Sequence, residues 1–228
     1  MKRIGIVGDF KPDKHTHIAL NKCVEHIRPH VSNVSFEWVP TNTLPNSPRT
    51  AYDAYWIAPG SPYTNDYAVY DLIRWSREND YTILGICGGF QYMVVEYARN
   101  VLGIHGSGHE ESEPDAEALI ISKLDCSLKG SSEPILITDR ESWLFKVLGT
   151  KKYDVKYNCA FGINPKYKEQ LNCYPLVFTA FSDEGQPRAF ELTSHRFFRG
   201  TLFQPPLNST SENPNPLILD FATFASNQ

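Results

Sequence analysis

A cysteine flanked by glycines is the residue in this sequence best placed to do chemistry. Cys87 lies in the segment Leu84–Gln91, which reads LGICGGFQ. The apolar run at residues 81–84 predicts a buried strand, and apolar side chains recur at helical spacing over residues 90–101. A strand, a tight turn and a helix with the reactive residue at the apex form a nucleophile elbow. The pattern therefore predicts that Cys87 is a nucleophile.

The predicted position of Cys87 would also activate its sulfur. Unpaired backbone N–H groups and the dipole at a helix N-terminus favour the thiolate form of cysteine. The next residue, Gly88, can point its N–H at a developing oxyanion. The alternative is a structural cysteine, because free cysteines are among the most buried residues. The glycines on both sides and the switch from strand to helix favour the nucleophile.

The composition limits the classes of protein that fit. A chain of 228 residues is long enough for one α/β domain, and we expect a single domain over 1–228. The net charge of −4, without a cluster of Lys or Arg, argues against a nucleic-acid partner. The 5 cysteines are widely spaced with no C-x-x-C pair, so neither a disulfide framework nor a metal site is expected.

The sequence also carries expectations about location and partners. The apolar run at residues 4–7 is too short for a signal peptide, and no stretch approaches a membrane span. We therefore expect a cytoplasmic protein without a membrane partner. No glycine-rich nucleotide-binding signature is present, so no cofactor is expected. The expected partner is a small-molecule substrate, and a homo-oligomer is left open.

The first half of the chain alternates between strands and helices, which predicts a mostly parallel sheet with helices on both faces. In such sheets ligands bind beyond the carboxyl ends of the strands, where Cys87 and the turn at Gly60 and Ser61 fall. The predicted strands are 4–7, 35–38, 54–58 and 81–84, and the predicted helices are 16–27, 66–79 and 90–101.

The second half has a different pattern, richer in strands. A hairpin is expected around Ser182–Gly185, because turn residues there separate two apolar runs. Residues 103–115 are polar and predict a loop. The remaining strands are expected at 118–124, 134–138, 153–159, 176–181, 188–192 and 200–203, with helices at 142–148, after Asn164 and at 216–224.

Seven segments spread along the chain form a pattern that can be compared with known families. They are Ala58–Gly60, Arg77–Asn79, Leu84–Gln91, Glu96–Val101, Glu111–Asp115, Phe161–Pro165 and Phe203–Pro205. These segments, in the same order, resemble the class I glutamine amidotransferases, and within them the glutaminase domain of CTP synthase. The sequence is also similar to free-standing proteins described as CTP synthase C-terminal region-related. The resemblance implies a flavodoxin-like amidotransferase fold for the whole chain.

The resemblance assigns roles to individual residues. Cys87 matches the family's nucleophile, Gly88 with the Gly60-Ser61 turn matches its oxyanion hole, and Glu111 matches the glutamate that binds the substrate amino group. The same resemblance implies a substrate pocket, although core packing explains Phe90 equally well and Cys159 is expected to pack rather than act as a second thiol. The predicted lining residues are Phe90, Gln91, Cys159, Phe161 and Gln204.

Two departures separate the sequence from the family pattern. The His-Pro-Glu motif that completes the family's triad is replaced by Gln204-Pro205-Pro206. Loss of a triad histidine costs about a million-fold in rate in a comparable enzyme. The Arg-Tyr-Glu segment that holds the substrate carboxylate aligns with Ala160–Gly162. Both departures argue against glutamine as the substrate.

The loop after the elbow helix offers the remaining proton carriers. Glu111 is the first candidate, because the resemblance places its match in the pocket and burial near a thiol would raise its pKa. His109 is the second candidate, with a solvated loop residue as the alternative.

Three functions remain after this comparison. The first is an enzyme in which Cys87 attacks a carbon–nitrogen bond of an amide or nitrile other than glutamine. The second is a non-catalytic binding or regulatory module, and the third is a glutaminase subunit of a larger amidotransferase. The glycine-flanked turn at Cys87 favours the first function, because a module without chemistry has no need of it.

Overall fold

A nine-stranded sheet forms the centre of the molecule, which a computed structural model describes over all residues 1–228. Five neighbouring strands pair in parallel and the other four pair antiparallel. The strand order is β2 (Val34–Val39), β1 (Lys2–Val7), β3 (Ala54–Ile57), β4 (Ile83–Ile86), β12 (Phe198–Thr201), β11 (Pro187–Leu192), β10 (Leu176–Phe181), β7 (Ser132–Ile137) and β8 (Lys152–Lys156).

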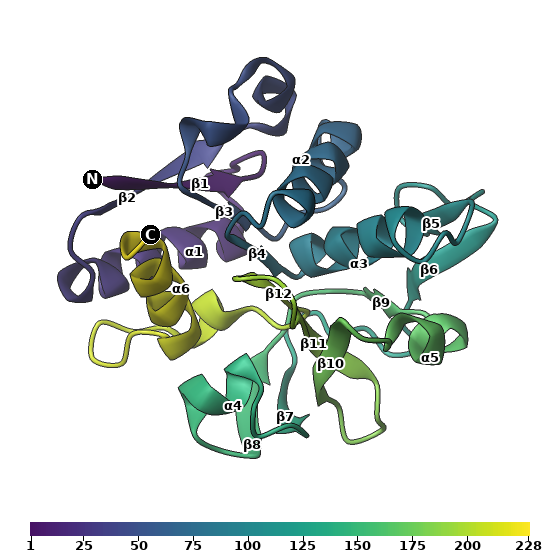
Figure 1. Ribbon diagram of the computed structural model, residues 1–228. Coiled ribbons are helices and arrows are strands. Elements are labelled where there is room, and N and C mark those ends of the chain that lie inside the picture. The colour runs from purple at the N-terminus through teal and green to yellow at the C-terminus, as the bar shows by residue number, and fades with distance from the viewer.

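Helices cover both faces of the sheet, as Figure 1 shows. On one face α1 (His15–Ile27) packs against α6 (Pro216–Ser226), and on the other α2 (Asp66–Glu78) packs against α3 (Gly88–Asn100). The short helix α4 (Trp143–Leu148) ends at Gly149, whose φ of 67° is left-handed, and α5 (Lys168–Leu171) follows a turn that Asn164 caps. None of these helices combines the length and apolar character needed to cross a bilayer.

The α/β class and the helices on both faces are confirmed. The parallel strands follow the order β2-β1-β3-β4-β12, which is the 2-1-3-4-5 order of flavodoxin-like sheets. Within the nine-stranded sheet, parallel pairing is confined to this half, which carries Cys87. In the other half the hairpin at Ser182–Gly185 joins β10 to β11, because a tight turn can connect only antiparallel strands.

A second, three-stranded sheet corrects one sequence prediction, and the end of β8 in the nine-stranded sheet corrects another. The three-stranded sheet contains β5 (Ser107–His109), β6 (Ala118–Lys123) and β9 (Phe161–Ile163). The predicted loop at 103–115 therefore holds a strand, and the strand predicted at 153–159 ends at Lys156. Strands of three residues are too short to show an alternating sequence pattern. Whether such a segment forms a strand depends on the neighbouring strand with which it pairs.

The helix that follows Cys87 is held on every side. All residues from Gly88 to Ala98 are buried, because α3 packs on β4 and β12, on α2 and on the small sheet. The carboxylate of Glu96 is fully buried and accepts hydrogen bonds from Arg77 Nε and Nη2, the latter at 2.7 Å. The pair joins α2 to α3 and fixes the helix that carries the elbow.

This pair gives a prediction about stability. Arg77→Met should lower the free energy of unfolding by about 3–5 kcal/mol, because it leaves the buried Glu96 carboxylate without a countercharge. Arg74→Met is the matched control on the same helix, since Arg74 makes an exposed pair with Glu78, and solvent screens exposed ion pairs so that they add little to stability. Urea denaturation of both variants measures the difference, and equal losses would contradict this role for the pair.

Candidate active site

Cys87 occupies a strained turn between β4 and α3. Its φ of 56° and ψ of −106° define a backbone conformation that residues other than glycine rarely adopt. Such a conformation costs about 1–3 kcal/mol and is concentrated at functional sites. A hydrogen bond of 2.8 Å from the Cys87 amide to the Thr201 carbonyl ties the turn to β12. The strand, turn and helix predicted around Cys87 are therefore present.

Close packing explains why glycine follows the elbow. A Cβ atom at Gly89 would lie 2.6 Å from the Ile57 carbonyl oxygen, and one at Gly88 would lie 3.0 Å from the Ser61 nitrogen. The N-terminus of α3 can thus approach β3 and the turn that follows it. This approach brings the backbone of Ser61 beside the predicted oxyanion donor Gly88.

A pocket of about 200 Å³ opens at Cys87. It lies at the carboxyl ends of β1, β3 and β4, as expected for a ligand site in a parallel sheet. Its walls come from the loops after these strands, from the segment between β8 and β9, and from the end of β12. The lining residues are Lys14, Thr16, Pro59, Gly60, Ser61, Cys87, Gln91, Glu111, Lys129, Asn158, Cys159, Ala160, Phe161 and Gln204.

The surroundings of Cys87 favour its thiolate. The neighbouring Cys159 thiol makes the largest contribution to lowering the Cys87 pKa. The Gly88 amide, the Gln204 side chain and the positive charge of Lys14 lower this pKa further, whereas burial opposes them. Conversely, the contact with Cys87 and burial raise the pKa of Cys159, which keeps its proton. Cys159 thus affects the ionisation of Cys87 as well as packing, and the Cys87 sulfur lies 4.0 Å from the Asn158 carbonyl oxygen.

Glu111 lies at the pocket, where the resemblance placed it. Desolvation raises the pKa of its carboxyl group, against the opposing effects of Lys129, Lys14 and the Ser61 side chain. A carboxyl group with a raised pKa keeps its proton to higher pH than a free glutamate, so it is better suited to donate a proton and take one back.

His109 is not among the pocket residues, so the structure does not bring this candidate to Cys87. Its ring is fully buried, and Nδ1 accepts a hydrogen bond from the Glu111 amide at 3.1 Å. The other nitrogen therefore carries the proton and donates to Gln91 Oε1 at 3.0 Å. Burial lowers the His109 pKa to about 4, which keeps the ring neutral. This geometry favours a role in positioning the Glu111 loop.

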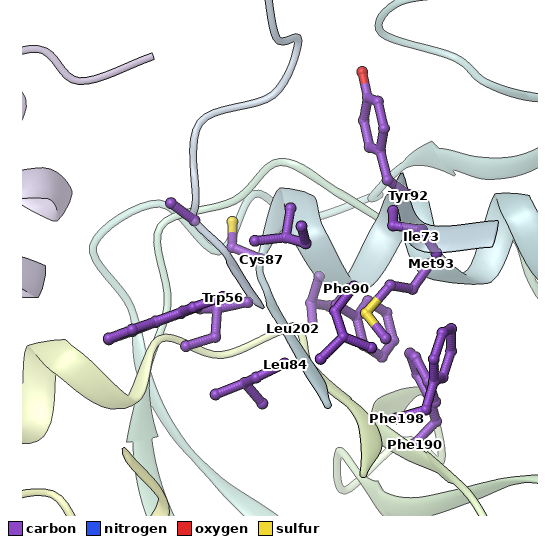
Figure 2. Packing of buried hydrophobic residues seen from close by; sticks show 14 of the residues in the cluster. Trp56, Ile73, Leu84, Cys87, Phe90, Tyr92, Met93, Phe190, Phe198 and Leu202 are labelled. Carbon is purple, nitrogen blue, oxygen red and sulfur yellow. The ribbon is translucent and has the colours of Figure 1, made fainter. Parts of the chain in front are cut away.

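The predicted wall residues divide into two groups. Gln91 and Phe161 line the pocket and are joined by a hydrogen bond of 2.8 Å from the Gln91 side chain to the Phe161 carbonyl. Phe90, by contrast, is fully buried and packs against Phe190 with ring centroids 5.3 Å apart. Figure 2 shows the Phe90 ring and the Cys87 sulfur pointing away from each other. The prediction that Phe90 contacts substrate is corrected, because its helix position faces the sheet.

Sequence reasoning missed the pocket wall formed by the loop between β1 and α1. Lys14 and Thr16 lie on this wall, and Lys129 and Asn158 lie elsewhere on the rim. The His17 ring positions the loop, because Nδ1 accepts from the Lys11 amide at 3.0 Å and Nε2 donates to the Pro59 carbonyl at 2.9 Å. The rule that ligands bind beyond parallel strands could have pointed to this loop.

These contacts predict the reactivity of the thiols. Cys87 should react with iodoacetamide faster than the other four cysteines at pH 7, because a lowered pKa gives a larger thiolate fraction than that of an ordinary cysteine. Cys159→Ala removes the neighbouring thiol that contributes most to lowering the Cys87 pKa, so the pH profile of Cys87 alkylation should move to higher pH. Cys126→Ala, an exposed site, is the control and should leave the profile unchanged. Faster labelling of any other cysteine in peptide mapping would contradict the elbow assignment.

Comparisons with known proteins agree with the fold and the site. The model of the class I glutamine amidotransferase family matches residues 19–221, so the chain belongs to this family. The CTP synthase of Methanopyrus kandleri is 27% identical over 243 residues, which cover 99% of this chain and 45% of that protein. The CTP synthase of Caldivirga maquilingensis is 34% identical over 180 residues, which cover 75% of this chain and 33% of that protein. The chain thus spans less than half the length of these relatives.

Solved structures share the fold. The glutaminase domain of Trypanosoma brucei CTP synthase, solved with bound acivicin, has a TM-score of 0.88 at 23% identity and covers 100% of this chain and 95% of that domain. A glutamine amidotransferase from Thermotoga maritima has a TM-score of 0.59 at 13% identity, covering 90% of this chain and 76% of that one. The chain is therefore homologous to the glutaminase domain of CTP synthase.

Proposed function

We propose that the chain is a cysteine-dependent enzyme that acts on a carbon–nitrogen bond of a small molecule other than glutamine. The observation that carries this proposal is the strained Cys87 turn, which opens into a pocket with a proton-carrying glutamate and a lowered thiol pKa. A binding module would gain nothing from a backbone strain of about 1–3 kcal/mol at this residue.

The residues opposite Cys87 support a substrate other than glutamine. Gln204 lines the same pocket as Cys87, and an amide cannot take up a proton. Ala160 lines the pocket in the segment that aligns with the family's carboxylate-binding arginine. Losing such a charge-assisted contact costs roughly 1.5–3 kcal/mol. A substrate recognised by other contacts fits this pocket better than glutamine does.

The proposed reaction uses the groups at the pocket in sequence. The Cys87 thiolate attacks the electrophilic carbon, and the N–H groups of Gly88 and of the Gly60-Ser61 turn stabilise the negative charge on oxygen. For an amide, the carbon–nitrogen bond breaks as Glu111 gives its proton to the leaving amine, which leaves a thioester on Cys87. Glu111 then takes a proton from water, whose oxygen attacks the thioester and releases the acid. For a nitrile, the first adduct is a thioimidate.

The proposal predicts that the protein releases no ammonia from glutamine at the rates of amidotransferases. The double variant Gln204→His with Pro206→Glu should also fail, because Ala160 still stands in the carboxylate-binding segment. A coupled ammonia assay over a panel of small amides and nitriles, with glutamine included, measures both. Thermal melting of the variant shows whether it is folded, and the wild type tests the prediction in any case. Rapid ammonia release from glutamine by either protein would overturn the proposal.

A further inference from the structure

The loop between β1 and α1 lies at the point where the order of strands in the sheet reverses. β1 pairs with β2 on one side and with β3 on the other, and the helices after β1 and β3 cover opposite faces. The loops leaving the two strands therefore diverge and leave a crevice, which is the usual ligand position in an open α/β sheet. Lys14 and Thr16 form one side of this crevice, and Pro59, Gly60 and Ser61 form the other.

Hydrogen-bond donors in this crevice lack partners within the protein. The Thr16 side chain is 1% exposed, it lines the pocket, and its hydroxyl makes no hydrogen bond. The backbone amides of His15 and Thr16 begin α1 and donate to no acceptor. The first turn of the helix contains no acidic side chain that could neutralise its dipole. These donors are arranged for an acceptor that the chain itself does not provide.

Lys14 adds an unpaired positive charge at the same place. It is half-buried and forms no ion pair within 4.0 Å, although Glu111 faces the same pocket. A Cβ atom on Gly60, whose φ is +137°, would lie 2.9 Å from Lys14 Nζ, so glycine at this position leaves room for the ammonium group. Lys129 is a second cation on the rim, against the single carboxylate of Glu111.

We propose that Lys14, the Thr16 hydroxyl and the first amides of α1 bind an oxyanion on the substrate, so that the enzyme acts on small amides or nitriles that carry a carboxylate or phosphate. Cys87 lines the same pocket, so an anion bound at α1 would orient the carbon–nitrogen bond toward its sulfur. Anions bind at helix N-termini because free N–H groups and the dipole act together. The claim that the bound molecule is a substrate rests on the proposed function. The claim that this site binds an anion does not depend on it.

The test measures binding in the Cys87→Ala protein, which removes chemistry. Isothermal titration calorimetry compares succinamate, an anionic amide, with its neutral counterpart succinamide. Inorganic phosphate, added as a competitor, tests whether the site accepts a phosphate group instead of a carboxylate. Succinamate should bind at least about tenfold more tightly than succinamide, the usual range for a charge-assisted contact. Lys14→Met should remove this preference, and Thr16→Val should reduce it. Lys22→Met, an exposed lysine on the same helix, should leave it intact.

The outcomes separate the two claims. Equal affinity for succinamate and succinamide, no binding of either, or the same loss in Lys22→Met as in Lys14→Met would overturn the oxyanion site. If phosphate competes strongly and succinamate binds weakly, the site is assigned to phosphorylated substrates. If succinamate binds strongly and phosphate competes weakly, the site is assigned to carboxylates. Absence of turnover in the wild type would overturn the proposed function and leave the binding result standing.

Discussion

Replacing Cys87 by alanine is expected to reduce turnover of a responsive amide or nitrile on the order of a million-fold, the loss seen when a nucleophile is removed from a comparable triad. The remaining oxyanion donors cannot form the covalent intermediate without the sulfur. The fold should persist, because alanine removes a single atom from a side chain that is 7% exposed. Initial-rate assays and thermal melting of the variant measure the two effects.

Two other cysteines serve as controls for this result. Cys126 is exposed and does not line the pocket, so the rate of Cys126→Ala should equal that of the wild type. Cys159→Ala should lower the rate at neutral pH more than at alkaline pH, because it raises the Cys87 pKa without removing the sulfur. Undiminished turnover by Cys87→Ala would exclude a cysteine mechanism.

Glu111→Gln is expected to lower turnover by roughly 10²–10⁴, the usual share of general acid–base catalysis. Glutamine keeps the size and hydrogen bonding of the side chain but cannot carry a proton. Burial raises the Glu111 pKa, so its acid form persists to higher pH than that of a free glutamate, and the rate should fall as pH rises through this pKa. The variant should lose this pH dependence, which pH–rate profiles of both proteins measure.

Neighbouring residues on the same loop provide the comparison. Glu110→Gln is the matched control, since the Glu110 carboxylate accepts a hydrogen bond from the Lys123 amide and does not line the pocket. His109→Asn tests the rival carrier, and we expect it to act through the position of the loop. Full activity in Glu111→Gln together with its loss in His109→Asn would show that histidine carries the proton.

The elbow could be predicted from the sequence because its signal is local. The strand, the glycines around Cys87 and the helical spacing of Phe90 and later residues lie within 21 consecutive residues, 81–101. The direction of side chains on a fully buried helix is not local. Phe90 and Gln91 are adjacent, yet packing against β12 and the small sheet sends one into the core and the other to the pocket.

Other parts of the site depend on contacts between distant segments. His109 could be assigned only once its two ring nitrogens were seen to bond with Gln91 and the Glu111 amide. Lys14 belongs to no motif, and it reaches the pocket because His17 ties its loop to Pro59. The spacing of residues along the chain contains neither fact, since both arise when loops from separate strands meet at one edge of the sheet.

The most direct test of the central claim is to look for the covalent intermediate on Cys87. The wild-type protein is incubated with a small amide or nitrile that it converts, quenched in acid during turnover, digested and analysed by mass spectrometry. A thioester or thioimidate on the peptide that contains Cys87, absent from the Cys87→Ala protein, is the predicted result. An adduct on another residue would contradict the account. So would turnover without any adduct, if the Cys87→Ala protein turned over the substrate at the same rate.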